Sequence, residues 1–459
     1  MKVCIIGTGY VGLVSGACFA EIGHIVTCVD TDEIKVSNLA QGRIPIYEPG
    51  LNELVVRNRT EGRLSFTTRI DDAVLSGVRL FFIAVGTPTD PADGGAVLDQ
   101  VYSAVESVAQ AIAHHKPEQD GRFVFVTKST VPVGTNRIIE QIVGRYIPEE
   151  RFAVASNPEF LREGAAVHDF MNPDRIIIGS SCDEACAVLE DLYRPLIRNG
   201  FPMHVVSSVQ TAELIKYAAN AFLATKITFI NEIARLSDAT GASIDEVVHG
   251  VGSDSRIGHS FLYPGPGYGG SCFPKDTQAL VKTAIEFNSP LGVVEAVIAA
   301  NQRHKLLMVR KIRKTLGGSL SGRRIAVLGL AFKANTDDMR DSPALVIVPG
   351  LTRAGATVVA YDPVAGTNAQ KVLPEIEIVD DLMVAVEGAD AIVILTEWPE
   401  FAQFDLNELT YRCRDKVVID LRNIVAEESR RGFRGRYVGL GRSETVPMEF
   451  PEDNQRQIA

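Results

Sequence analysis

"KVCIIGTGYVGLVSGACFAEIGHIVTCVD" (residues 2–30) decides the fold of the N-terminal part of the chain. A short apolar strand leads into a glycine-rich turn, a helix follows, and a second strand ends in Asp30. In this βαβ context Gly7 permits the tight turn, Gly9 admits a pyrophosphate, and Gly12 lets helix and strand pack closely. The helix N-terminus would face the phosphates with its partial positive charge. Asp30 would bind the ribose hydroxyls and repel a 2′-phosphate, so the stretch predicts a Rossmann domain that binds NAD rather than NADP.

Further apolar runs recur at the spacing of alternating strands and helices, at residues 79–88, 122–132, 151–159 and 175–179. Such continuous runs are typical of parallel strands that are buried on both faces. In a doubly wound sheet the ligand lies at the carboxyl ends of the strands. We therefore expect Thr87, Thr130 and Glu159, which stand at the ends of three of these runs, at one crevice.

The segment "NPEFLREG" (157–164) carries two carboxylates four residues apart. Asn157 is a favourable N-cap and Pro158 a favourable first helical residue, so the pattern predicts a helix with Glu159 and Glu163 on one face. Two hypotheses follow. Either the carboxylates lie together at the crevice, or they form a solvated pair that Arg162 partly compensates.

Residues 205–314 are expected to be mostly helical. One long helix ends at Gly241 and places Lys216 and Asn220 on one face of an otherwise apolar stretch. A solvated lysine is the ordinary alternative, but a lysine beside an asparagine here suits the stabilisation of an oxyanion or alkoxide. A second helix of about 30 residues, within 289–318, would span a domain and either link two domains or pack against a second subunit.

The C-terminal part repeats the βαβ pattern, with strands near 324–329 and 357–361 followed by Asp362. Its turn, "GLAFK" (329–333), is not a dinucleotide fingerprint, so we expect a second Rossmann-like domain for another ligand. Lys333, Arg340 and Arg422 follow strand ends there and suit an anionic group such as a pyrophosphate. The predicted fold is α/β, with two Rossmann-like doubly wound parallel-sheet domains joined by a helical region with a long central helix. The expected divisions are 1–204 for NAD, 205–314 for the helical dimerisation region, 315–441 for the second ligand, and 442–459 as an irregular tail.

The segment "GGSCFPKD" (269–276) sets Cys272 among glycines, where a ligand can approach the backbone. Gly269 and Gly270 would leave room for that ligand, and Lys275 with Lys216 would favour the thiolate. This setting predicts a cysteine nucleophile.

Composition narrows the function classes. The 459 residues carry a formal net charge of −11, which argues against a general nucleic-acid binder. No apolar run approaches the ~20 residues of a membrane span. Seven cysteines without a CxxC pair predict a reducing cytoplasm and neither a disulfide framework nor a metal site. The N-terminus superficially resembles a lipoprotein signal ending at Cys18, but the glycines of the βαβ turn interrupt its apolar stretch.

Seven motifs in order resemble the UDP-glucose/GDP-mannose dehydrogenase family, from Met1 to about Ile424: "GTGYVG", "STVPVGT", "NPEFLREG", "KYAANAF", "RIG", "GPGYGGSCFPKD" and "AFKANTDDMRDSPA". "NPEFLREG", the later "NPDRIIIG" and "GPGYGGSCFPKD" are similar to the UDP-glucose branch. The resemblance implies oxidation of the C6 alcohol of UDP-glucose to UDP-glucuronate with two NAD, through a cysteine thiohemiacetal and thioester, in a cytoplasmic homodimer or higher homo-oligomer that serves polysaccharide biosynthesis. The alternative is another nucleotide sugar, such as GDP-mannose or a UDP-N-acetylhexosamine.

The resemblance also implies roles for single residues. Cys272 would be the nucleophile, Lys216 and Asn220 would stabilise the oxygen anion, Asp276 with Thr130 would orient a water, and Glu159 would assist thioester hydrolysis. The implied NAD contacts are Gly7, Gly9, Tyr10, Val11, Gly12, Asp30, Lys35, Gly86, Thr87, Thr130, Glu163, Lys275 and Arg340. The implied substrate contacts are Glu159, Phe160, Leu161, Arg162, Glu163, Lys216, Asn220, Arg256 (often from a neighbouring subunit), Phe261, Tyr263, Gly265, Gly269, Lys333 and Arg422.

Two rival classes stay open at this point. A simple two-electron alcohol dehydrogenase needs no thiol, so Cys272 argues against it, and the number of NADH formed per substrate separates the two. A non-catalytic NAD-binding protein has no use for the combined set of Cys272, Lys216, Asn220 and Asp276.

Overall fold

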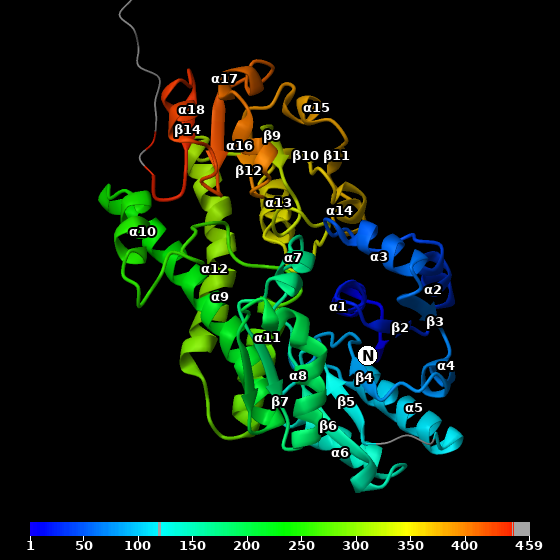
Figure 1. The fold of residues 1–459 in the computed structure, drawn as a ribbon. Coiled ribbons are helices and arrows are strands. Elements are labelled where there is room, and N and C mark those ends of the chain that lie inside the picture. Colours follow the sequence, from blue (N-terminus) through cyan, green and yellow to red (C-terminus); the bar gives the residue numbers. More distant parts are fainter. Residues whose placement is uncertain (118–120, 443, 445–459) are drawn as a thin grey trace, which may run out of the picture. The chain divides into compact units, whose positions relative to one another are not determined.

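The computed structural model describes residues 1–117, 121–442 and 444, and these fall into two compact units (Figure 1). The first unit consists of Met1–Ala221 and Lys275–Leu291, and the second of Phe222–Pro274 and Gly292–Ala459. The expected irregular tail, 442–459, lies outside the described residues except for Arg442 and Glu444. Among the described residues, no helix combines the length and the apolar character that a membrane span needs.

The first unit is built on an eight-stranded sheet in the order β3-β2-β1-β4-β5-β6-β7-β8. All neighbours are parallel except β6 and β7, which pair antiparallel through Ser156 and Gly179. Its strands are β1 (Lys2–Ile6), β2 (Ile25–Val29), β3 (Leu64–Thr67), β4 (Leu80–Ile83), β5 (Phe123–Thr127), β6 (Phe152–Ser156), β7 (Ile176–Gly179) and β8 (Met203–Val206). Its helices are α1 (Tyr10–Glu21), α2 (Glu33–Ala40), α3 (Leu51–Thr60), α4 (Ile70–Leu75), α5 (Asp99–His115), α6 (Thr135–Gly144), the 3-10 turn η1 (Glu149–Arg151), α7 (Ala166–Met171) and α8 (Asp183–Arg198).

Helices cover both faces of this sheet, because successive strand residues point to opposite sides. Val3 and Ile5 of β1 pack into a core with α1, α3, α7 and α8. Cys4 and Ile6 pack into a second core with α4, α5 and α6. Two buried faces explain why the strands read as continuous apolar runs.

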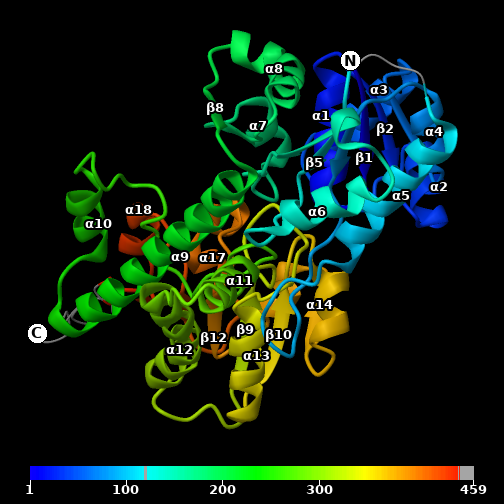
Figure 2. The same ribbon diagram turned by 90° about the horizontal axis from the view of Figure 1, so that it is seen from below.

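The second unit has a six-stranded, fully parallel sheet in the order β11-β10-β9-β12-β13-β14. Its strands are β9 (Arg324–Leu328), β10 (Thr357–Tyr361), β11 (Glu377–Val379), β12 (Ala391–Ile394), β13 (Val417–Asp420) and β14 (Arg436–Val438). Its helices are α10 (Ile244–Gly252), α12 (Gly292–Thr315), α13 (Ala344–Arg353), α14 (Gly366–Val372), α15 (Leu382–Val386), α16 (Pro399–Gln403), α17 (Leu406–Leu409) and α18 (Glu427–Arg431). Helices α12 and α13 lie side by side and share a core with one face of the sheet (Figure 2). The predicted fold class is thereby confirmed.

Two helices cross between the units along the chain. The 32-residue α9 (Val209–Thr240) begins in the first unit and continues into the second, and α11 (Phe273–Glu286) enters the first unit at Lys275. The second long helix, α12, has 24 residues rather than about 30. It starts after Pro290 and ends before Gly317 and Gly318, whose φ values of 82° and 90° end the helical conformation.

The expected helix at 157–164 is wrong. The chain stays non-helical after β6, and α7 begins only at Ala166. Glu159 and Glu163 therefore share no helical face. Glu159 bonds instead to Lys216 and to the Leu161 amide.

The close packing of the first turn gives a test of the fold. A Cβ on Gly12 would lie 1.9 Å from the Gly7 carbonyl oxygen, whereas a Cβ on Gly9 would meet no described atom within 4 Å. Gly12→Ala should therefore lower the free energy of unfolding by about 1–3 kcal/mol or more, through overpacking. Gly9→Ala is the matched control. It should unfold as the wild type does but lose NAD binding, because its methyl group occupies the approach of the pyrophosphate. Thermal unfolding with and without NAD measures both, and a wild-type Tm for Gly12→Ala would contradict the packing argument.

Candidate active site

The turn between β1 and α1 has the shape of a pyrophosphate cradle. Gly7 has φ +98°, and a Cβ there would lie 2.8 Å from the carbonyl oxygen of Ala84 at the end of β4. The space beside Gly9 is open, and α1 begins at the next residue, Tyr10. The amide groups of a helix N-terminus thus lie beside a gap without side chains, which fits a dinucleotide.

Asp30 lies at the end of β2 and is fixed as a carboxylate. Its Oδ2 accepts hydrogen bonds from the Thr8 amide at 2.8 Å and the Thr8 hydroxyl at 2.6 Å, and it pairs with Lys35 at 3.0 Å. Burial alone would raise the pKa of Asp30, but these bonds, with one from the Asp32 amide, hold the pKa below its ordinary value. A negative charge at this strand end disfavours a 2′-phosphate.

The ends of β4 and β5 are joined by side chains of the expected site. The Thr87 hydroxyl donates to the Thr130 carbonyl oxygen at 3.0 Å, and the Ser129 hydroxyl donates to the Val85 carbonyl oxygen at 2.7 Å. The structure therefore places Thr87 and Thr130 together at one edge of the sheet, as the strand pattern predicts.

Glu159 and Lys216 form a buried ion pair. Lys216 Nζ lies 3.0 Å from Glu159 Oε1, and the two side chains are 4% and 5% exposed. Burial alone would raise the pKa of Glu159, but the charge of Lys216 and a 2.6 Å bond from the Leu161 amide lower it. The carboxylate thus bonds to the backbone two residues on and to a lysine of α9, so the segment cannot coil into a helix. The solvated-surface hypothesis is wrong for Glu159, and Arg162 pairs with Asp169 instead.

One helical turn along α9 lies a second polar pair. The Asn220 amide donates to Asp276 Oδ2 at 2.6 Å, and Lys275 Nζ donates to Asp276 Oδ1 at 2.6 Å. Asp276 is buried. The spacing of Lys216 and Asn220 on one helical face therefore brings together an ammonium–carboxylate pair and an amide–carboxylate pair in the first unit.

Cys272 is half-buried and directly precedes Phe273, the first residue of α11. Its Sγ lies 3.4 Å from the Ser271 hydroxyl. A thiol at a helix N-terminus is more readily deprotonated than a free one, which suits a nucleophile. The proximity of Cys272 to Lys216 and Asn220 stays a prediction.

The glycines before Cys272 lie close to other residues of the chain. A Cβ on Gly269 would lie 2.3 Å from the Asp341 carbonyl oxygen, and one on Gly270 would lie 2.6 Å from the Phe332 ring. The Gly270 amide also donates to the Arg340 carbonyl oxygen at 2.9 Å. These glycines let the loop pack closely against residues 332 and 341, and the room that they would leave for a ligand stays a prediction.

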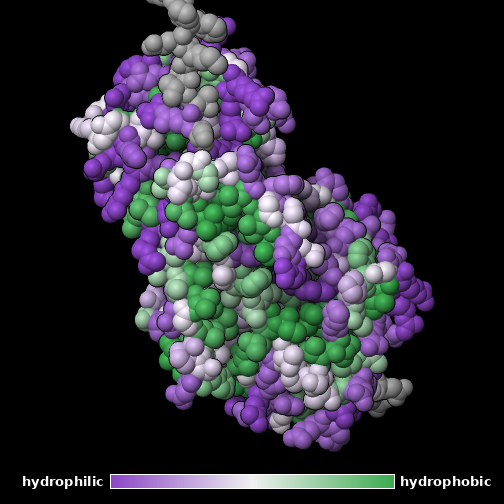
Figure 3. Space-filling model, turned by 90° about the vertical axis from the view of Figure 1, so that its left-hand side faces the viewer, coloured by the Kyte–Doolittle hydropathy of each residue, from purple (hydrophilic) through white to green (hydrophobic). Residues whose placement is uncertain are grey.

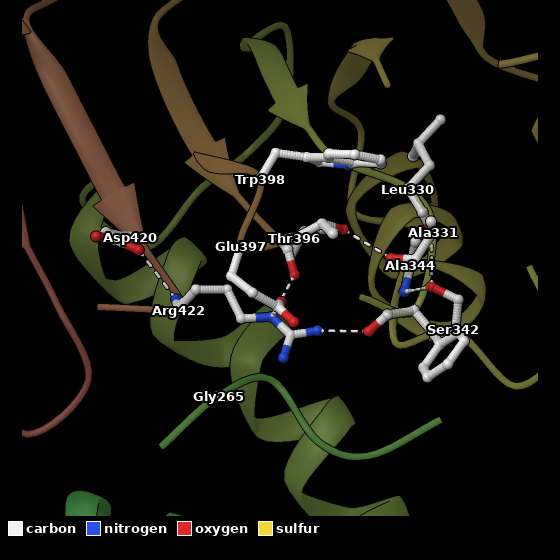
Figure 4. Close-up of polar contacts among 12 residues, drawn as sticks. Gly265, Leu330, Ala331, Ser342, Ala344, Thr396, Glu397, Trp398, Asp420 and Arg422 are labelled. Carbon is white, nitrogen blue, oxygen red and sulfur yellow. Dashed lines mark hydrogen bonds and ion pairs between the residues drawn. The ribbon is translucent and has the colours of Figure 1, made fainter. Parts of the chain in front are cut away.

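Arg422 lies beside another glycine of this loop, as Figure 4 shows. Its guanidinium donates to the carbonyl oxygens of Leu395 and Phe332, each at 2.7 Å, and lies 3.1 Å from Glu397 Oε2. A Cβ on Gly265 would lie 3.3 Å from this guanidinium. Arg422 therefore joins the ends of β12 and β13 to the residues after β9, and it borders the loop that the sequence assigns to the substrate.

Several expected ligand contacts lie at the surface of the second unit. The Arg256 side chain is 86% exposed and pairs with Asp254, and the Arg340 side chain is 64% exposed and pairs with Asp338. Tyr263 is also exposed, whereas Lys333 is half-buried beside the Phe332 ring. The ligand contacts expected of these residues stay predictions.

The sequence interpretation missed the side chains that hold the loop with Gly265 and Tyr268. Asn301 of α12 bonds to both backbone groups of Tyr268, and His304 Nε2 bonds to the Gly265 carbonyl oxygen at 2.8 Å. Asn231 of α9 accepts from the Gly265 amide at 2.8 Å. Burial lowers the pKa of His304 to about 4, so its neutral ring donates to Gly265 through Nε2. The sequence did contain a signal for these side chains. Asn301 and His304 are polar residues three apart in a helix with buried apolar positions, so they lie on one helical face.

Curated relatives match almost the whole chain. A UDP-glucose 6-dehydrogenase of Rhizobium meliloti is 50% identical over 446 residues, which cover 96% of this chain and 100% of that protein. UDP-glucose 6-dehydrogenase TuaD of Bacillus subtilis is 46% identical over 96% of this chain and 93% of its own. Among solved structures, a UDP-glucose dehydrogenase of Pyrobaculum islandicum superposes with a TM-score of 0.87 at 38% identity, covering 96% of this chain and 98% of that one.

The choice of cofactor can be tested at Asp30. The wild type should prefer NAD over NADP in kcat/KM by well over tenfold, because a 2′-phosphate would face the carboxylate. Asp30→Ala should narrow this ratio and leave Lys35 free to meet the phosphate. Steady-state kinetics with both cofactors measure it. A similar kcat/KM for the two cofactors in the wild type would contradict the assigned role.

Three family models match in order along the chain. The NAD binding domain of the UDP-glucose/GDP-mannose dehydrogenase family matches residues 1–197, its central domain 210–303, and its UDP binding domain 326–427. Together with relatives that share up to half of the sequence, these matches show that the chain belongs to the UDP-glucose/GDP-mannose dehydrogenase family.

Proposed function

We propose that this chain oxidises C6 of UDP-glucose to the carboxylate of UDP-glucuronate in two NAD-dependent steps on Cys272. NAD-dependent oxidation of UDP-glucose is the activity expected from the sequence, and relatives with 43–50% identity that are named UDP-glucose 6-dehydrogenases confirm it. The observation that carries the covalent route is the pair of buried polar contacts on α9, Lys216–Glu159 and Asn220–Asp276.

The proposed route divides a four-electron oxidation into two equal steps and a hydrolysis. The Gly7–Gly12 turn and Asp30 would hold NAD, which would supply the hydride acceptor for each oxidation. In the first step the alcohol loses its hydroxyl proton and a hydride and becomes an aldehyde. The Cys272 thiolate adds to the aldehyde carbon, and the resulting thiohemiacetal loses a second hydride to give a thioester. Water then releases the carboxylic acid and regenerates the thiol.

The buried pairs suit the charges that develop on this route. Lys216 and Asn220 would donate to the oxygen that becomes anionic when the alcohol is deprotonated and when the thiolate adds. Asp276, with Thr130, would orient the water and accept its proton. Glu159 would assist the hydrolysis. A site shielded from water strengthens each of these interactions.

The ligands are assigned to the divisions of the chain as the sequence predicts. Residues 1–204 would bind NAD, and residues 315–441 would bind the nucleotide sugar, with Lys333, Arg422 and the 263–269 loop. Arg256 would reach the sugar, and Glu163, Lys275 and Arg340 would contact NAD. Glucose is favoured over the alternative sugars because a UDP-D-ManNAc dehydrogenase of Pyrococcus horikoshii superposes less closely, with a TM-score of 0.81 at 29% identity.

A homodimer or higher homo-oligomer is supported by an exposed apolar face of the second unit. Phe222, Phe229 and Leu236 recur every seven residues on α9 and are each at least half exposed. Val293 and Leu306 of α12 are exposed as well, and apolar side chains gather on the side where both helices lie (Figure 3). Such faces mark association surfaces. Seven cysteines without a CxxC pair support a reducing, cytoplasmic setting.

The nucleophile is tested by Cys272→Ser. The change keeps the shape but replaces the thiol by a much weaker nucleophile and a poorer leaving group, so turnover should fall by several orders of magnitude. Binding of UDP-glucose and NAD should change little. Rates of NADH formation and calorimetric binding measure the two effects. Two NADH per UDP-glucose at a near wild-type rate would overturn the covalent route.

The role of Glu159 is tested by trapping the thioester. Glu159→Gln should slow hydrolysis, so that an acyl-enzyme accumulates after mixing with UDP-glucose and NAD. Glu163→Gln is the matched control, which should mainly weaken ligand binding. Intact-mass spectra at short times detect the adduct. Normal turnover of Glu159→Gln without any adduct would remove Glu159 from the hydrolysis.

A further inference from the structure

A second lysine lies buried near the Glu159–Lys216 pair. Lys128 directly follows β5, and its Nζ donates to Asn157 Oδ1 at 3.0 Å and to the Tyr193 hydroxyl at 3.1 Å. The Tyr193 hydroxyl in turn donates to the same Asn157 oxygen at 2.6 Å. Asn157 stands two residues before Glu159, so this network fixes the strand end that carries the carboxylate.

Among the described residues, Lys128 has no carboxylate partner of its own. Both hydrogen-bond partners of Lys128 are neutral, and within residues 1–117 and 121–442 it forms no ion pair. Lys128, Lys216 and Glu159 interact electrostatically, so the Glu159 carboxylate feels the charge of both lysines away from water. An unpaired ammonium is costly to bury, and a lysine in this position gives up its proton readily.

We propose that Lys128 is a positioning residue for the hydrolysis of the thioester, which acts through Glu159. Its hydrogen bonds hold the strand end in place, and its charge sets the basicity of the Glu159 carboxylate. This inference rests on the proposed role of Glu159 in hydrolysis.

The charge of Lys128 changes near neutrality. Burial lowers the pKa of Lys128 to about 7, with Glu159 opposing the shift and Lys216 adding to it. Below this pH two ammonium groups stabilise the carboxylate and make it a weak base. Above it the charge of Lys128 is lost, so Glu159 becomes more basic and hydrolysis should be faster.

Tyr193 and Phe170, on two other elements around Lys128, do not titrate in this range. Helix α8 contributes Tyr193, whose pKa burial raises far above neutrality, and α7 contributes the ring of Phe170, 6.0 Å from Nζ. Helix α9 contributes Lys216, paired with Glu159. A pH dependence of hydrolysis near 7 is therefore assigned to Lys128.

The experiment follows the decay of the acyl-enzyme between pH 6 and 8.5. The full-length enzyme is mixed with UDP-glucose and NAD, quenched at short times and analysed by intact mass, and the hydrolysis measured in Glu159→Gln is subtracted as background. In the wild type the rate should rise several-fold, up to about tenfold, with a midpoint near 7.

Three variants separate charge from structure. Lys128→Met removes the charge, so its rate should lose the inflection near neutrality. Lys128→Arg keeps the charge at every pH, so its rate should stay at the low level. Tyr193→Phe removes one hydrogen bond but leaves the lysine, so it should lose thermal stability and retain the wild-type pH dependence.

Each outcome decides the proposal. A wild-type rate without an inflection between pH 6 and 8.5, which requires no variant to fold, would overturn it. The proposal would also be overturned if folded Lys128→Met kept the inflection in its rate of hydrolysis between pH 6 and 8.5. If Glu159→Gln forms no acyl-enzyme at normal turnover, the role of Glu159 fails and this proposal fails with it. If that adduct forms while the Lys128 variants follow the wild type, only the role of Lys128 fails.

Discussion

The ion pair between Glu159 and Lys216 is the constraint on which the first unit's polar interior depends. Removing two charges from water costs several kcal/mol per ion, and their attraction offsets this cost only if the remaining hydrogen-bonding capacity is used. The Leu161 amide supplies one such bond to the carboxylate. The chain after β6 must therefore stay non-helical, and α9 must keep the face with Lys216 and Asn220 turned inward. Both requirements follow from one contact, between two residues that lie 57 positions apart in the sequence.

Local signals were sufficient for much of the fold and for part of the site. The GxGxxG turn, the continuous apolar strands and the four-residue spacing of Lys216 and Asn220 each involve neighbours in the chain. The helix predicted at 157–164 failed because Asn157 and Pro158 favour a helix start, whereas Glu159 bonds to a lysine that the local pattern does not contain. The short strands β3, β8, β11 and β14 were not identified, because none of them is a fully buried apolar run like the equally short β4 and β7.

The loop with Gly265 and Tyr268 shows what sequence alone could not provide. Asn301 and His304 bond to backbone groups 33 and 39 residues away. Every residue carries such backbone groups, so the sequence does not show which of them a side chain will bond. The same holds for Gly269, whose lack of a side chain is explained by the carbonyl oxygen of Asp341. The glycines thus indicated that something packs closely against this backbone. The structure was needed to show that Asp341 of the same chain does so at Gly269.

The divided make-up of the first unit has a consequence for its synthesis. Met1–Ala221 leaves the ribosome before Lys275–Leu291, and at about 5–20 residues per second the interval lasts roughly 3–11 s. Glu159 and Lys216 are both available before this interval, but Asp276, the partner of Asn220, arrives only after it. During this interval the surface of the first unit that α11 covers is exposed. It can be covered only after the 53 residues Phe222–Pro274 of the second unit have been synthesised. Translation speed across this stretch sets how long that surface is available to chaperones.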